Sequence, residues 1–80
     1  MKTITVRYFA LFREQAGLGE ETLELAADTA LDVFEATRDR HRSPEPYGHC
    51  KVAINDEMAD WTSRVEDGDT VLLFPPVAGG

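Results

Sequence analysis

The strongest constraint on the fold is the apolar run Val71-Leu72-Leu73-Phe74 near the C-terminal end of the sequence. Its residues do not alternate with polar ones, which is typical of a strand covered on both faces in the middle of a sheet. Asp67-Gly68-Asp69 predicts a tight turn just before it. Pro75 and Pro76 end it, because neither residue donates a ladder hydrogen bond. The run therefore predicts a central last strand over residues 70–74.

The other strands are predicted from the alternation of polar and apolar residues. This alternation marks a half-buried first strand, a second strand after a short helix, and a third strand that ends near Asn55-Asp56. Gly17 predicts a left-handed cap that ends the short helix. Met58 and Trp61 indicate a short, irregular segment. The predicted ranges are 3–8, 10–16 (helix), 22–25 and 52–54.

One main helix is predicted after the second strand. Thr29 is its N-cap, and Asp32 completes a capping box with Asp in place of the usual Glu. Basic residues gather at the other end, where positive charge complements the helix dipole, so we interpret them as a helix-end arrangement rather than a binding patch. The expected apolar stripe is Leu31, Val33 and Phe34, and the basic residues are Arg38, Arg40, His41 and Arg42.

The order of these elements is strand, strand, helix, strand, short strand, strand. If the first and last strands are parallel neighbours, the long connection between them must be right-handed, and the helix supplies it. The fold class predicted is α+β, specifically a β-grasp in which a mixed sheet of four to five strands curls around one main helix. We expect residues 1–76 to form this domain and residues 77–80 to form a flexible tail.

Composition limits the possible functions. Eighty residues form one small domain, and a net charge of −7 excludes nucleic acid as a favoured partner. The charge favours a basic protein partner or serves solubility alone. The lone Cys50 forms no intramolecular disulfide, which favours the cytoplasm. The N-terminus lacks a signal-peptide pattern, and no apolar run approaches the roughly 20 residues of a membrane helix, so no membrane association is expected.

No catalytic or metal-binding set is apparent in the sequence. His41, His49 and Cys50 do not have the spacing of metal ligands, and no nucleophile with its base stands out. We therefore interpret Cys50 as a small apolar residue and expect no metal. The aromatic residues Phe9, Phe12 and Phe74 are expected to lie mostly in the core. Because side chains alternate along a strand, one of Leu73 and Phe74 is expected to be exposed towards a partner.

The C-terminal tail carries the most functional information. Residues 71–80 include no charged side chain, and the two prolines direct Val77-Ala78-Gly79-Gly80 away from the sheet. These four residues reach about 13 Å beyond the domain when extended. Glycine lets a backbone pass through a narrow channel and leaves the Gly80 carboxylate unhindered for adenylation by ATP. The acyl-adenylate would then accept sulfur to give a C-terminal thiocarboxylate.

The sequence resembles the small sulfur-carrier subunits of molybdopterin synthase, which are ubiquitin-like proteins of the ThiS type. The resemblance spans nearly the whole chain except the loop at residues 41–50. It is carried by Phe74-Pro75-Pro76-Val77-Ala78-Gly79-Gly80 and by the preceding Glu66-Asp67-Gly68-Asp69-Thr70-Val71. Supporting matches are Val6-Arg7-Tyr8-Phe9-Ala10 with Arg13-Glu14, and Val52-Ala53-Ile54-Asn55.

The resemblance implies a functional cycle and a set of partners. It implies that an activating enzyme uses ATP to adenylate Gly80, that a sulfur donor converts it to the thiocarboxylate, and that the chain itself holds no cofactor. It implies further that the large synthase subunit receives the tail in a heterotetramer, where sulfur passes to cyclic pyranopterin monophosphate. The small subunit would not be an enzyme by itself. The implied site is Gly80 with the partner-binding tail Phe74, Pro75, Pro76, Val77, Ala78 and Gly79.

Three alternatives remain open from the sequence. The same chemistry serves thiazole synthesis or tRNA thiolation in other pathways. The chain could instead be a protein modifier whose Gly80 forms an isopeptide bond with a lysine. In the third alternative it is an interaction module with an inert tail.

Overall fold

The computed structural model describes residues 1–42 and 50–75. Within these residues the chain forms one five-stranded mixed sheet and two helices, in the order β-α-β-α-β-β-β. This confirms the predicted α+β class and the β-grasp arrangement. The elements are β1 (Lys2–Tyr8), α1 (Leu11–Ala16), β2 (Glu20–Leu25), α2 (Ala30–His41), β3 (Lys51–Ile54), β4 (Glu57–Ala59) and β5 (Thr70–Phe74).

The last strand lies in the middle of the sheet, as its apolar sequence predicts. The strand order is β2-β1-β5-β3-β4, with β5 parallel to β1 and antiparallel to β3. The turn before β5 has Gly68 at φ 90°, and its N–H donates to the Thr3 carbonyl at 2.8 Å. Glycine adopts this φ without strain, so the turn brings β5 back alongside the start of β1.

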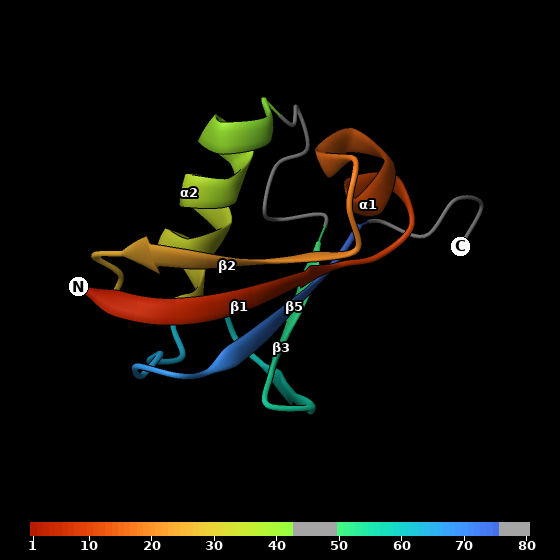
Figure 1. Ribbon diagram of the computed structural model, residues 1–80. Coiled ribbons are helices and arrows are strands. Elements are labelled where there is room, and N and C mark those ends of the chain that lie inside the picture. The colour runs from red at the N-terminus through yellow and green to blue at the C-terminus, as the bar shows by residue number, and fades with distance from the viewer. Residues whose placement is uncertain (43–49, 76–80) are drawn as a thin grey trace.

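The core lies between the sheet and α2, which stands over one face of the sheet in Figure 1. Alternate residues of β1 point into it, and so do alternate residues of β5. From α2 the core receives Val33 and Phe34, while Leu31 is only half-buried at its edge. Trp61 packs edge-on against Phe34, with ring centroids 5.1 Å apart. The largest fully buried side chains are Phe34, Ile4, Leu73, Val6, Val33, Val52, Val65 and Val71.

The start of α2 is closed by the predicted capping box. The Thr29 hydroxyl accepts the Asp32 N–H at 3.4 Å, and Asp32 Oδ2 accepts the Thr29 N–H at 3.1 Å. Asp32 Oδ2 also accepts the Asp28 N–H at 3.0 Å. These backbone N–H groups lower the pKa of Asp32, because they stabilise the ionised carboxylate. The box therefore satisfies helix-end donors that have no intrahelical partner.

Replacing the cap is expected to destabilise the fold by a moderate amount. Thr29→Ala removes the acceptor for the Asp32 N–H, which costs about 1 kcal/mol and lowers the melting temperature by about 4–8 °C. Thermal unfolding followed by circular dichroism measures the change. Thr62→Ala, an exposed threonine in the turn after β4, is the matched control. Equal melting temperatures for the two variants would show that the capping box contributes nothing.

Candidate functional site: the end of β5 and the sheet face beside it

The described part of the tail is its root, Phe74 and Pro75. Phe74 is the last residue of β5 and pairs with Lys51 at the start of β3, while Leu73 pairs with Tyr8 at the end of β1. The chain therefore leaves the sheet at the end of its central strand, between β1 and β3. The predicted site residues Pro76, Val77, Ala78, Gly79 and Gly80 lie outside the described residues, and so does the predicted domain boundary at residue 76.

An aromatic pair marks this root. The rings of Phe9 and Phe74 stack with centroids 4.7 Å apart and an interplanar angle of 16°. Both side chains are half-buried, so the expectation that they lie mostly in the core is wrong, and among the three phenylalanines it holds only for Phe12. The reason is the alternation along a strand: Tyr8 and Leu73 face α2, so Phe9 and Phe74 face away from it. Of Leu73 and Phe74, Leu73 is buried in the core and Phe74 is half-buried on the opposite face, so the two differ as expected although neither side chain is fully exposed.

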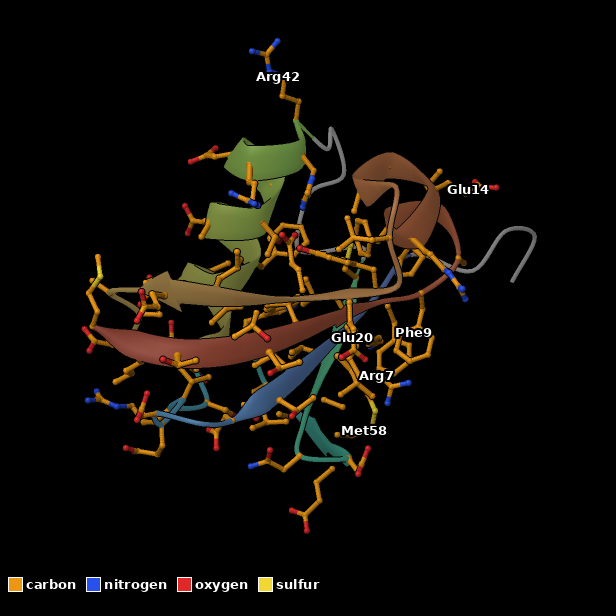
Figure 2. The ribbon with its side chains drawn as sticks, viewed as in Figure 1. Arg7, Phe9, Glu14, Glu20, Arg42 and Met58 are labelled. Atoms are coloured by element: carbon orange, nitrogen blue, oxygen red, sulfur yellow. The ribbon has the colours of Figure 1, made fainter. Side chains whose placement is uncertain are left out.

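The aromatic pair belongs to a larger apolar area on the sheet face opposite α2. Ala53 pairs with both Leu72 and Met58, so their side chains share this face with Phe74. Leu72 is only 7% exposed, whereas Met58 is 66% exposed. We call the five residues Phe9, Ala53, Met58, Leu72 and Phe74 the aromatic face. Figure 2 shows Phe9 and Met58 on the side of the sheet away from α2, with Arg7 between them.

The turn after β1 holds Phe9 in its place. Ala10 takes φ 49°, a conformation that residues other than glycine rarely adopt, and α1 begins directly after it. The Phe9 carbonyl accepts the Phe12 N–H at 3.1 Å, which closes the turn. Backbone strain of this kind persists only where surrounding contacts impose it. Here the contacts are Phe12 in the core and Phe9 on the opposite face.

Sequence reasoning missed a polar cluster on the other side of the sheet. Glu21 of β2 accepts the Tyr8 hydroxyl at 2.6 Å and Arg40 Nε at 2.9 Å, and it also contacts His41 Nε2. The end of α2 is thus tied to β1 and β2, so its basic residues do more than complement the helix dipole. The sequence does contain a signal for this cluster. Side chains alternate along β2, and the charged Glu21 falls on the same face as the apolar Leu23 and Leu25.

The cluster changes the acidity of two of its members. Burial and the hydrogen bond to Glu21 raise the pKa of Tyr8, so its phenol remains a donor. Burial alone would raise the pKa of Glu21, but the hydrogen bonds from Tyr8, His41 and Arg40 outweigh it and lower that pKa. The carboxylate is therefore held in its ionised form. The cluster ties the end of α2 to β1 and β2.

The other candidates from the sequence were Cys50 and a metal site. Cys50 is buried at 4% exposure, which agrees with its interpretation as a small apolar residue. Within residues 1–42 and 50–75, no three His, Cys, Asp or Glu side chains gather as metal ligands. In the same ranges, neither helix has the length and apolar character needed to cross a membrane.

Comparison with known proteins identifies relatives along almost the whole chain. The ThiS family model matches residues 6–80. The molybdopterin synthase sulfur carrier subunit of Escherichia coli K12 is 34% identical, and the match covers 96% of this chain and 99% of that protein. The subunit of the same name from Chlamydomonas reinhardtii is 33% identical, with coverage of 96% and 98%.

Solved structures show two kinds of similar protein. The small archaeal modifier protein 1 of Haloferax volcanii is 28% identical, with a TM-score of 0.81 and coverage of 96% of this chain and 100% of that one. A similar chain from Helicobacter pylori was solved in a complex of subunits 1 and 2 of molybdopterin-converting factor. It is 26% identical, with a TM-score of 0.66 and coverage of 98% and 99%.

Proposed function

Because this chain belongs to the ThiS family, we propose that it is the sulfur-carrier subunit of molybdopterin synthase. The observation that carries the proposal is that the family match runs through Gly80, at the end of a tail rooted in the central strand. The two curated relatives, each matched over almost their full length, have this same name. We also propose that the chain works in the cytoplasm, which a sequence with a single cysteine favours.

The proposed chemistry resides in the terminal carboxylate. An activating enzyme uses ATP to adenylate Gly80, which forms an acyl–phosphate bond and releases pyrophosphate. Sulfur at the oxidation level of sulfide, delivered by a donor, then attacks the acyl carbon, and AMP leaves with the electron pair of the broken C–O bond. The product is the Gly80 thiocarboxylate, whose sulfur passes to cyclic pyranopterin monophosphate. In this cycle the chain is a sulfur donor rather than a catalyst, and it needs no bound cofactor of its own.

The aromatic face supports docking to the large synthase subunit. A tail that enters a partner brings its root against the partner's surface, and Phe74 is that root. The Helicobacter pylori complex has a similar chain bound to a second subunit. Aromatic side chains, phenylalanine among them, are enriched in protein interfaces, and Phe9 and Phe74 are stacked in advance of binding. We propose a heterotetramer of two large and two small subunits.

Removing one ring of the pair is expected to weaken this complex. Phe74→Ala deletes half of the stack at the tail root, and the dissociation constant should rise about 30-fold, as for an aromatic hot spot worth about 2 kcal/mol. Isothermal titration calorimetry with the purified large subunit measures it. Leu31→Ala is the matched control, because Leu31 is half-buried on α2 at the opposite side of the sheet. Equal affinities for both variants would rule out the aromatic face as the docking surface.

The proposed function is tested by reconstitution with purified components. The chain, preloaded as thiocarboxylate, is mixed with the large subunit and cyclic pyranopterin monophosphate, and the pterin product is measured by chromatography. Stoichiometric formation of molybdopterin supports the assignment. Failure with an active large subunit, together with sulfur delivery to a thiazole-forming or tRNA-thiolating enzyme, would assign the chain to one of those pathways instead.

A second candidate function is protein modification. The specific observation is the similarity to the small archaeal modifier protein 1. Activation by adenylation is common to both roles, but in a modifier the acyl group passes to a lysine amine. Peptide mass spectrometry of cell lysates distinguishes them, because a modifier leaves lysines joined to Gly80. Trypsin cuts this chain last after Arg64, so the branch left on such a lysine is residues 65–80.

A further inference from the structure

The charges of this chain are separated along the direction of the strands. One end of the sheet is where β1 and β5 end and the tail begins. The antiparallel strands β2 and β3 start at this same end, and α1 and the C-terminal end of α2 also lie there. We call this the tail end of the fold. Of the eight basic residues, six lie there, against four described acidic residues. The six are Arg7, Arg13, Arg38, Arg40, Arg42 and Lys51.

The opposite end is strongly acidic. It holds the turns before β5 and between β3 and β4, the end of β2 and the start of α2. Eight of the described acidic residues lie there with two basic ones, Lys2 and Arg64. Lys2 is engaged, because its Nζ donates to the Ala27 and Val65 carbonyls at 2.7 and 2.9 Å. Among the described residues, acidic groups therefore outnumber basic ones at this end, and basic groups outnumber acidic ones at the tail end.

Three of the cations flank the aromatic face. The Arg7 guanidinium carbon lies 5.8 Å from the centre of the Phe9 ring, and Arg7 also pairs with Glu20 at 3.7 Å. Lys51 is the strand partner of Phe74. Arg13 and Phe9 line a shared hollow on the surface, and the Arg13 guanidinium lies over Gly19. Neither Lys51 nor Arg13 forms an ion pair with another described residue.

Resting on the proposed function, we infer that the large synthase subunit surrounds the entrance for the tail with carboxylates that pair with Arg13, Lys51 and Arg7. An unpaired arginine beside an aromatic docking surface has a geometry suited to bidentate carboxylate binding. Screening limits electrostatic attraction to about 8 Å at physiological ionic strength, so the partner responds to the nearest end rather than to the net charge. The acidic end is then repelled, which orients the encounter with the tail foremost.

The test compares one charge reversal at each end. Arg13→Glu and Arg64→Glu make the same change in net charge, but only Arg13 lies at the tail end. Stopped-flow association of the full-length chain with the large subunit should slow about tenfold for Arg13→Glu at low salt and less than twofold for Arg64→Glu. The wild-type rate should fall as salt rises, and the Arg13→Glu rate should fall less.

A second variant controls for misfolding of the Arg13→Glu chain. Arg13 packs on Gly19, so its replacement could disturb α1, whereas Lys51 is an exposed strand residue without such packing. Lys51→Glu should therefore slow association in the same direction. The inference is overturned if the wild type binds and the tail-end reversals leave the rate unchanged or raise it, or if Arg64→Glu has an equal effect. Absence of wild-type binding would instead count against the proposed function itself.

Discussion

Deleting Gly80 is expected to abolish sulfur loading of this chain, lowering the rate of thiocarboxylate formation at least about 100-fold. The shortened chain still ends in a glycine, Gly79, so its terminal group is chemically unchanged. Its carboxylate, however, is drawn back by about 3.3–3.6 Å when the tail is extended. A displacement of about 1 Å from the reactive geometry already costs about 100-fold in rate. Single-turnover loading assays with ATP, the activating enzyme and a sulfur source measure the effect.

The control for this deletion keeps the length of the tail. Ala78→Gly changes the side chain at a neighbouring position and leaves the carboxylate at its original distance from Phe74, so it should load within about threefold of wild type. Normal loading of the shortened chain would mean that the position of the terminal carboxylate does not matter. The tail would then not be held in extended form by its activating enzyme.

Replacing Glu21 is expected to have the largest effect on stability among the polar substitutions. Glu21→Ala leaves the Tyr8 hydroxyl and the end of α2 without their acceptor, and breaking a partly buried charged cluster of this kind costs about 2 kcal/mol. A domain of this size is stable by only about 5–15 kcal/mol, so the loss is a large fraction of the total. Urea denaturation measures it. Glu24→Ala, on the exposed face of the same strand, is the control.

The contribution of Glu21 should also depend on pH. The pKa of Glu21 is lowered in the folded chain. Its ionisation therefore stabilises the fold above the pKa of a glutamate in the unfolded chain, which is about 4.3. That stabilisation is lost as the pH falls through the folded-state pKa. The difference in unfolding free energy between wild type and Glu21→Gln should therefore shrink from pH 7 towards pH 3. A difference that stays constant over this range would show that the charge of Glu21 is not what stabilises the cluster.

The fold was predictable from local signals that each have a direct physical cause. The apolar run at 71–74 requires cover on both faces, which places β5 in the middle of the sheet. The capping residues Thr29 and Asp32 predict the start of α2. The main features of the sheet follow from these two observations and from the handedness of the connection. Local sequence therefore predicts those elements whose physical cause lies within a few consecutive residues.

The candidate site was only partly predictable, because its key contacts join distant segments. Phe9 and Phe74 are apolar and close to buried positions, so composition favoured the core for both. Their stacking depends on β1 and β5 being in a register that pairs Tyr8 with Leu73, which sequence alone does not give. The Glu21 cluster likewise depends on where the end of α2 meets β2. The charge separation becomes visible only when strand directions are known.

The central claim is that the terminal acyl group of this chain carries a transferable sulfur atom. Intact mass spectrometry tests it most directly, on the full-length chain incubated with ATP, its activating enzyme and a sulfur source. The account predicts a mass increase equal to the replacement of one oxygen by sulfur, located on Gly80 by fragmentation and absent when ATP is omitted. An unchanged mass with an enzyme shown to be active on a known sulfur carrier, or sulfur found on Cys50 instead, would contradict it.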